Sequence, residues 1–202
     1  MSSVRCIVLS LVILCWPLLA LAGEAVPYRL DPVHSRVMFS VMHDGYSKVI
    51  GTFAHPEGTL WFDPDDWSRA KVDVRIDLAT LDLGDADFNA RIARGDYLDA
   101  KDHPQAHFVS QTVEGLSKTE AKVHGLLRLR GEQTPVTLDV TLNRIARSAW
   151  SLRRTVGFSA TATLSRAALG MSKHRSAVGD KVELRIEVEA VRTQRSATDG
   201  DL

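Results

Sequence analysis

Hydrophobic and polar residues alternate with a period of two along most of this chain. In the first such run Val37, Phe39, Val41 and His43 fall on one side, and the residues between them fall on the other. This period is typical of a β-strand that buries one face. The Asp-Pro pair that begins at Asp31 comes just before the run. Because proline fixes its own φ and disfavours a helical residue before it, we predict a turn followed by a half-buried strand.

Later segments repeat the alternation, most regularly over residues 72–78, where valine, isoleucine and leucine alternate with aspartate and arginine. One predicted strand is kinked at His55-Pro56, since proline cannot donate a hydrogen bond to a neighbouring strand. Including residues 36–43, eight strands are expected, and the other seven lie at 48–62, 72–78, 106–113, 121–129, 136–142, 152–164 and 182–188.

The period changes once, between residues 85 and 94. There Phe88 and Ile92 are four residues apart, Asp85 is a suitable N-cap, and Gly95 ends the segment. This pattern predicts one short amphipathic helix, inserted after the third strand. The fold class is therefore mainly β, and eight antiparallel strands with one apolar face each form a sandwich or a closed barrel. Alternation does not distinguish a hollow barrel from one that is filled by side chains.

The strand expected at residues 152–164 favours a hollow interior. Phe158, Ala160 and Ala162 share its apolar face, and the two alanines leave space that larger side chains would fill. Arg154 falls on the same face. Because an unpaired buried charge is costly, Arg154 either binds an anionic ligand group at the barrel mouth or precedes the regular part of the strand.

Residues 1–22 have the pattern of a secretory signal peptide. Arg5 is their single charge, a long apolar run follows it, and Ala20-Leu21-Ala22 ends the segment. We expect cleavage before Gly23. A membrane anchor is the alternative, but Pro17 breaks the apolar run, which is barely long enough to cross a bilayer.

Cleavage would remove both cysteines, so the exported chain would fold without disulfides, which fits a Gram-negative periplasm best. The chain has 25 basic and 25 acidic residues and no basic run, which argues against nucleic acid as a partner. Residues 193–202 are polar, and we expect them to form a disordered tail.

No set of residues indicates a catalytic or metal site. His103 and His107 are four apart, but Pro104 separates them and a strand is expected from residue 106. Residues four apart in a strand are about 13 Å apart, too far to share one ion. Ser68 and Lys71 match S-x-x-K without the motifs that accompany it in serine acyl enzymes. We therefore predict neither an enzyme nor a bound cofactor or metal.

Two other histidines are candidates for local or ligand contacts. His34 follows the Asp-Pro turn, where we expect it to bond Asp31 or nearby backbone groups. His43 ends the apolar face of the first predicted strand. There it is either a structural histidine bonded to the backbone or a partner for the head group of a ligand.

Short motifs are spread over residues 27–192. They are Leu30-Asp31-Pro32-Val33-His34-Ser35, Phe39-Ser40-Val41-Met42-His43, Gly51-Thr52-Phe53, Tyr97-Leu98-Asp99 with Pro104 and Phe108, Gly125-Leu126-Leu127-Arg128-Leu129-Arg130-Gly131, Pro135-Val136-Thr137-Leu138, Gly157-Phe158-Ser159-Ala160, Arg166, Gly170-Met171 and Val178-Gly179-Asp180-Lys181-Val182. In this order they together resemble the YceI-like family of polyisoprenoid-binding proteins. The chain departs from the family pattern at Arg91-Ile92-Ala93-Arg94 and at Ala168-Leu169, both expected near the ends of the cavity.

The resemblance implies that residues 23–192 form a single lipocalin-like barrel that is exported and encloses an isoprenoid lipid or an isoprenoid quinone. On this basis we predict that apolar residues line a tube and that His43 and Arg154 serve its polar end. The expected lining residues are Val37, Phe39, Val41, Phe53, Leu98, Phe108 and Phe158.

Two other functions remain open from the sequence. One is a small barrel isomerase or hydrolase that uses His43 on an amphiphilic substrate, and the other is a stress or structural protein with a solid core and no ligand. A homodimer and a transient contact with a membrane or a membrane protein are compatible with all three functions.

Overall fold

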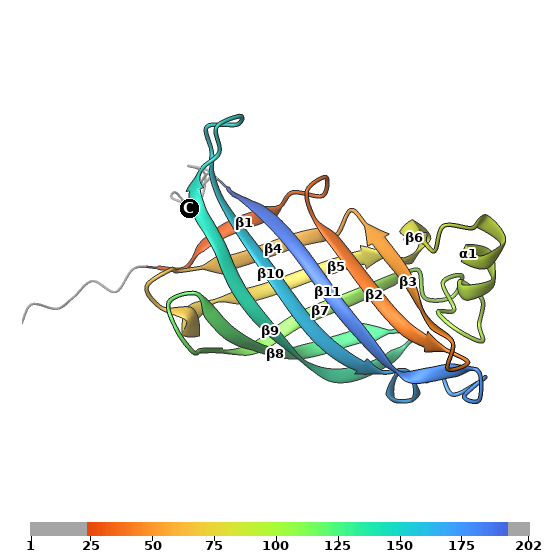
Figure 1. Ribbon diagram of the computed structural model, residues 1–202. Helices are drawn as coiled ribbons and strands as arrows, with labels where there is room; N and C mark the ends of the chain where they lie inside the picture. The colour runs from red at the N-terminus through yellow and green to blue at the C-terminus, as the bar shows by residue number, and fades with distance from the viewer. Residues whose placement is uncertain (1–23, 194–202) are drawn as a thin grey trace, which may run out of the picture.

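The computed structural model describes residues 24–193, which form a β-barrel with a short helix at one end (Figure 1). The predicted signal peptide and the predicted tail beyond Thr193 lie outside the described residues. Within residues 24–193, no helix has both the length and the apolar character needed to cross a bilayer.

In the described part of the chain, eleven strands form one antiparallel sheet. Three single-turn 3₁₀ helices, Trp67–Arg69, Leu78–Thr80 and Ala167–Leu169, and the helix α1, Ala86–Ile92, connect some of them. The strands are β1 (Val26–Leu30), β2 (Arg36–His43), β3 (Ser47–Ala54), β4 (Glu57–Phe62), β5 (Lys71–Asp77), β6 (Leu81–Asp82), β7 (Gln105–Gly115), β8 (Glu120–Leu129), β9 (Glu132–Arg147), β10 (Arg154–Ser165) and β11 (Val178–Arg192).

The eleven strands make a closed barrel of eight long strands, because three of the long strands are interrupted. β1 pairs with β4 and β2 with β3, so β1–β2 and β3–β4 are two long strands with a break in each. β5 and β6 form the third broken strand. β11 closes the barrel by pairing with β10 along one edge and with both β1 and β2 along the other. The predicted eight-stranded barrel is confirmed.

Turn chemistry explains where two of the three breaks occur. After β1, the side chain of Asp31 accepts hydrogen bonds from the backbone N–H of Val33 at 2.9 Å and from the ring of His34 at 2.8 Å. Between β3 and β4, His55 has a φ of 52° and precedes Pro56, which matches the predicted kink. Both breaks therefore follow from local residue types.

The sequence predicts the start of the helix α1 correctly, but it places the start of one strand two residues too early. The side chain of Asp85 accepts a hydrogen bond from the backbone N–H of Phe88 at 2.8 Å, which confirms the predicted cap of α1. The seventh predicted strand begins at Arg154 and not at residue 152. Leu152 has a left-handed φ of 56° and belongs to the turn that joins β9 to β10.

The interior of the barrel contains two apolar clusters, one toward each end. In the cluster that includes Tyr28 and Val156, the rings of Phe62, Trp67 and Phe158 pack against one another. Their centroids are 4.9 Å apart for Phe62–Trp67 and 5.2 Å apart for Phe62–Phe158. We call this part of the barrel the filled half.

The second cluster lies near α1 and includes Leu78, Leu98, Leu169 and Met171, and we call this part the open half because a cavity lies within it. The predicted hollow at Ala160 and Ala162 is not where this cavity lies, since neither alanine lines it. The interior is thus filled toward one end and hollow toward the other.

Candidate functional site

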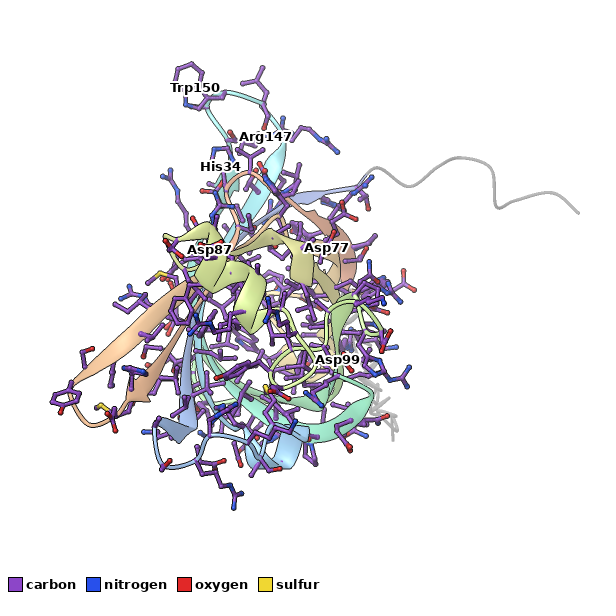
Figure 2. All side chains as sticks on the ribbon, turned by 90° about the vertical axis from the view of Figure 1, so that its right-hand side faces the viewer. His34, Asp77, Asp87, Asp99, Arg147 and Trp150 are labelled. Carbon is purple, nitrogen blue, oxygen red and sulfur yellow. The ribbon has the colours of Figure 1, made fainter. Side chains whose placement is uncertain are left out.

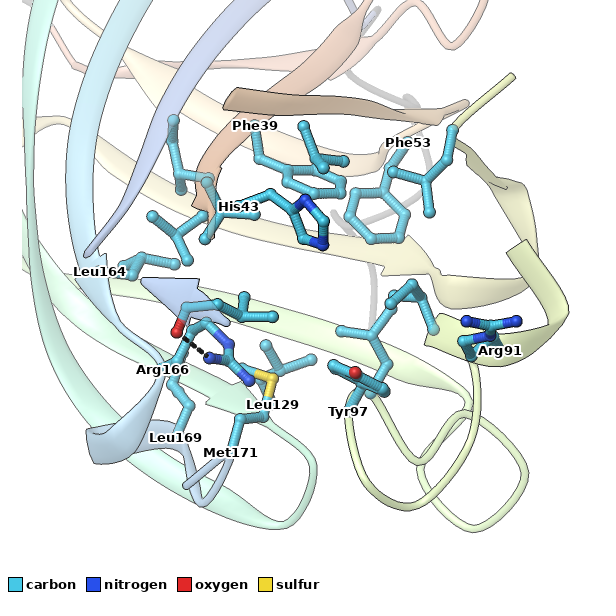
Figure 3. Close-up of a pocket in the computed structure, with 18 of the residues that line it drawn as sticks. Phe39, His43, Phe53, Arg91, Tyr97, Leu129, Leu164, Arg166, Leu169 and Met171 are labelled. Carbon is cyan, nitrogen blue, oxygen red and sulfur yellow. Dashed lines mark hydrogen bonds between the residues drawn. The ribbon is translucent and has the colours of Figure 1, made fainter. Parts of the chain in front are cut away.

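The open half contains a cavity of about 210 Å³ beneath α1 (Figure 3). Most of its lining is aliphatic or aromatic and comes from strands on several sides of the barrel and from α1. The apolar lining residues are Phe39, Val41, Val49, Phe53, Leu83, Phe88, Ile92, Leu98, Leu129, Leu164, Leu169, Met171, Val178, Val182 and Leu184.

Strands β2 and β3 form one wall because alternate residues point inward. The rings of Phe39 and Phe53 lie 5.6 Å apart at an angle of 32°. Gly51 makes room for this arrangement, since a Cβ atom there would lie 2.4 Å from Cζ of Phe39 and 2.7 Å from Cδ2 of Leu83. A glycine at this position therefore lets an aromatic ring lie flat against the wall and leaves the centre empty.

The segment after α1 closes over the cavity. The backbone N–H of Leu98 donates to the carbonyl of Ile92 at 3.1 Å, and that of Ala100 donates to Ala93 at 2.9 Å. These bonds turn the chain back, and the buried side chain of Leu98 lines the cavity. This turn explains why Leu98, predicted as a lining residue, reaches the cavity.

Four polar side chains also border the cavity, namely His43, Arg91, Tyr97 and Arg166. Arg166 is only 5% exposed. Its guanidinium donates to the carbonyls of Val178 at 3.1 Å and Lys173 at 3.2 Å. It also lies 5.9 Å from the centre of the Tyr97 ring.

Within residues 24–193, no carboxylate forms an ion pair with Arg166. Burial lowers the pKa of the Arg166 guanidinium from its ordinary value, and the charge of Asp180 opposes this shift. The guanidinium remains protonated at neutral pH, because arginine titrates far above it. The cavity therefore combines an apolar lining with one buried positive charge.

The structure brings together five of the nine residues predicted to bind a ligand. Phe39, Val41, His43, Phe53 and Leu98 all line the cavity. In Figure 3 the rings of Phe39, His43 and Phe53 lie along the same side of it. These five come from the strand hairpin β2–β3 and from the segment after α1.

The other four predicted residues lie elsewhere. Val37 and Phe108 belong to the barrel interior outside the cavity lining, with Phe108 packed against both apolar clusters. Phe158 belongs to the aromatic group of the filled half. Arg154 is exposed at the start of β10, opposite Arg147 of β9. Phe62 and Trp67 pack beside Phe158. They come from segments far away in sequence, so their proximity to Phe158 cannot be predicted without the fold.

Arg166 lines the cavity but was not among the residues predicted for the site. It follows Leu164 by two positions and so continues the inward face of β10. That spacing is a signal that could have identified it. Arg91 and Leu169 also line the cavity, and both lie in segments where the chain departs from the family pattern.

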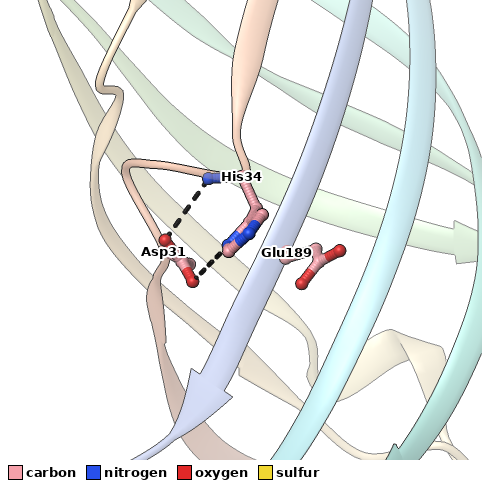
Figure 4. A group of neighbouring side chains, drawn as sticks. All are labelled: Asp31, His34 and Glu189. Atoms are coloured by element: carbon pink, nitrogen blue, oxygen red, sulfur yellow. Dashed lines mark hydrogen bonds and ion pairs between the residues drawn. The ribbon is translucent and has the colours of Figure 1, made fainter. Parts of the chain in front are cut away.

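His34 forms the predicted bond with Asp31, which is confirmed at 2.8 Å (Figure 4). This hydrogen bond raises the pKa of the His34 imidazole and lowers that of the Asp31 carboxyl. Glu189 lies beside them, and one potential metal-ligand atom from each residue falls within 4.8 Å of the others. Nδ1 of His34 is already bonded to Asp31, so these two side chains form a hydrogen-bonded surface pair with Glu189 beside it.

The two histidines considered for a metal each contact a different carboxylate. His107 Nε2 lies 2.8 Å from Asp73, on the neighbouring strand β5, and His103 Nε2 lies 3.9 Å from Asp99. Each imidazole therefore has a local partner of its own.

Comparison with known proteins places these features in a family. Residues 28–190 match the YceI-like domain. A UPF0312 protein of Pseudomonas putida strain W619 is 34% identical over 175 residues, covering 85% of this chain and 90% of the relative. A UPF0312 protein of Shewanella baltica is 29% identical over 174 residues, covering 85% and 91%.

Solved structures show the same fold. Burkholderia cenocepacia BcnA aligns with a TM-score of 0.71 and 28% identity, covering 80% of this chain and 99% of BcnA. A polyisoprenoid binding domain from Saccharophagus degradans aligns with a TM-score of 0.64 over 83% of this chain and 99% of that domain. At 14% identity, the second comparison concerns the fold alone. From the domain match and the Pseudomonas relative, this chain belongs to the YceI-like domain family.

Proposed function

We propose that this protein binds the hydrocarbon chain of an isoprenoid lipid in the cavity of the open half, without chemical conversion of the lipid. The observation that carries the proposal is a cavity inside a closed barrel. Its lining is apolar except for the side chains of His43, Arg91, Tyr97 and Arg166. The fold shared with a polyisoprenoid binding domain of another organism supports the same ligand class.

Burial of apolar surface supplies the affinity in this proposal. Each Å² of hydrocarbon removed from water contributes about 25 cal/mol, before the costs of ordering the ligand. The cavity side chains make few directional contacts, so isoprenoid chains with different head groups bind with similar affinity. An isoprenoid quinone and a polyisoprenoid alcohol are both acceptable ligands.

Arg166, Tyr97 and His43 are the polar groups that an oxygen-bearing head group would meet at the cavity. Arg166 already donates to backbone carbonyls, and its position at the wall is therefore fixed before the ligand arrives. We further propose that the protein is exported to the periplasm, where such a carrier shields a lipid from water. The signal-peptide pattern of residues 1–22 supports this location.

Native mass spectrometry of the purified protein, followed by organic extraction, tests lipid binding directly. A co-purifying lipid of discrete mass, or saturable uptake of a fluorescent isoprenoid alcohol, is the expected result. A clean protein mass together with no uptake of the probe would contradict the proposal.

A filling substitution links that binding to the cavity. Val182→Phe places a ring in the space bounded by β2 and β11, and we expect it to reduce probe uptake about tenfold or more. Val109→Phe is the matched control, because Val109 lies outside the cavity lining and is 39% exposed. Equal uptake by both variants would place the lipid elsewhere on the protein.

A further inference from the structure

The turn between β9 and β10 projects from the barrel as a separate feature. We call residues 144–154 the arginine hairpin. Figure 1 shows this hairpin extending beyond the other strands, and in Figure 2 Trp150 lies at its outer end, away from the barrel. Trp150 is 98% exposed and Leu152 is 70% exposed. Large apolar side chains at such exposure on a protruding tip are typical of an interaction surface.

Hydrogen bonds hold this tip in shape. The hydroxyl of Ser148 accepts from the backbone N–H groups of Trp150 and Ser151, both at 3.3 Å. The backbone N–H of Ser148 donates to the carbonyl of Arg153 at 2.9 Å, and that of Leu152 donates back to Ser148 at 2.9 Å. Leu152 adopts a left-handed φ of 56° within this turn. The backbone at Leu152 is therefore strained, and the side chains of Leu152 and Trp150 point outward from the turn.

The charge of the hairpin has one sign. It carries Arg144, Arg147, Arg153 and Arg154 and no acidic residue. All four are exposed, and within residues 24–193 none forms an ion pair with a carboxylate. Arg153 donates to the carbonyl of Arg192 at 3.1 Å, which anchors the hairpin to the end of β11.

Carboxylates lie near the base of the hairpin but not at its tip. Asp31, Glu187 and Glu189 line the same surface groove as Arg144 and Arg147. Asp31 is bonded to His34, and Glu187 accepts from Ser159 and Arg185. These acids temper the charge of the groove and leave the outer turn positively charged.

From these observations we propose that the arginine hairpin docks on the surface of a bilayer that contains anionic lipids. Trp150 and Leu152 enter the interfacial layer, where an indole ring is favoured because one edge is apolar and its N–H can be solvated. The arginines bind lipid phosphates, which match their planar donor groups. Leu152 beside Trp150 favours a lipid over a nucleic acid, because an aliphatic side chain gains nothing from stacking on bases.

The position of the hairpin is compatible with simultaneous ligand binding. It joins the filled half of the barrel, whereas the cavity lies toward α1 at the other end (Figure 1). Docking therefore leaves the cavity residues uncovered. The inference goes beyond lipid binding in the cavity and does not depend on it.

Vesicle co-sedimentation of the purified protein tests the docking. We expect binding to vesicles of phosphatidylglycerol and phosphatidylethanolamine, none to vesicles of phosphatidylcholine alone, and weaker binding as salt is added. The fluorescence of Trp150 should shift to shorter wavelength on binding, and Trp150→Ser should remove that shift. Equal binding to both vesicle types, or binding to neither, would overturn the proposal.

Paired variants separate the hairpin from general electrostatics. Arg147→Gln with Arg154→Gln should lower the partition coefficient about 25-fold, since each basic residue near an anionic surface contributes about a fivefold factor. Lys118→Gln with Arg128→Gln removes the same charge from exposed positions outside the hairpin and should change it less than about threefold.

Trp150→Ser alone should weaken vesicle binding about tenfold. Equal losses in the two double variants would show that net charge alone drives binding and would overturn the proposal. Binding to a single-stranded oligonucleotide as tight as to anionic vesicles would also overturn it, because it would assign the hairpin to a nucleic acid.

Discussion

The filled half and the open half of the barrel are built from the same alternating strands but enclose different interiors. In the filled half, Phe62, Trp67 and Phe158 from three separate segments meet edge to face within one apolar cluster. In the open half, Phe39 and Phe53 are neighbours on adjacent strands and lie along one wall. Aromatic rings fill a barrel when they converge from different sides and leave it hollow when they line one side.

Glycine contributes to the same contrast. The ring of Phe39 lies in the space that a side chain at position 51 would occupy. The ring therefore rests against the wall and does not extend across the cavity. In the described part of the chain, no glycine has an atom of Phe62 or Phe158 among those nearest to the position of its absent Cβ. The size of the interior therefore depends on where rings can rest as much as on how many there are.

The largest effect we expect is from Phe62→Ala. Phe62 is 1% exposed and contacts both other rings, so its loss leaves a cavity that its neighbours cannot fill. The free energy of unfolding should fall by about 3–5 kcal/mol. Phe53→Ala should cost about 1–3 kcal/mol, because Phe53 already borders empty space. Urea denaturation measures both, and similar losses would mean that the two halves are packed alike.

The next effect compares two glycines. A Cβ atom at Gly125 would lie 2.5 Å from both Cζ of Phe108 and the backbone oxygen of Val109, and the backbone cannot move aside easily. Gly125→Ala should therefore destabilise by about 3 kcal/mol. At Gly51 the close atoms are side-chain atoms of Phe39 and Leu83.

Gly51→Ala should cost about 1 kcal/mol, because Phe39 can turn into the cavity. It should also reduce uptake of the isoprenoid probe, whereas Gly125→Ala should not do so in the protein that remains folded. Thermal denaturation and the uptake assay measure the two effects. A larger loss of stability at Gly51 would contradict the assignment of free space beside Phe39.

A smaller effect concerns acid stability in the open half. Hydrogen bonds from Lys48 and Lys181 lower the pKa of the Glu183 carboxyl to about 2, from an ordinary value of 4.5. Because the folded-state pKa is depressed, the stabilisation is present above pH 4.5 and is lost as the pH falls through about 2. Lys48→Gln should raise the midpoint of the Glu183 titration followed by NMR. An unchanged midpoint would show that the Lys48–Glu183 contact between β3 and β11 does not persist in solution.

The smallest effect is at His34, whose partner Asp31 lies at the break between β1 and β2. The hydrogen bond to Asp31 raises the pKa of His34 above its ordinary 6.5. The associated stabilisation is therefore complete below pH 6.5 and is lost as the pH rises through the elevated value. Asp31→Asn should lower the His34 midpoint measured by NMR. A midpoint that stays elevated in Asp31→Asn would assign the shift to Glu189 instead.

The fold could be predicted from the sequence because its signals are local. Alternation over residues 72–78, the Asp-Pro turn at Asp31 and the cap at Asp85 each act within a few residues. The filling of the barrel is not local. Whether Phe158 meets another ring depends on Phe62 and Trp67, which lie far away in sequence and next to it in space.

Arg166 is an intermediate case. Its spacing from Leu164 indicates an inward side chain, but its carbonyl partners are Lys173, in the turn before β11, and Val178, the first residue of β11, which the alternation does not bring near it. The five cavity residues that were predicted share a simpler reason. They lie on the hairpin β2–β3 or in the segment that follows α1. Within each of these two pieces, residues that are close in sequence also lie close together in the cavity wall.

The pairing of β11 has a consequence for how the protein is made. This strand ends at Arg192, yet it supplies the hydrogen-bonding edges for β1, β2 and β10, including the bond from Asp31 to Glu189. A nascent chain cannot complete its barrel until β11 has been synthesised. Until then β1, β2 and β10 each lack a partner along one edge, so translation that stops before β11 should yield an aggregation-prone fragment.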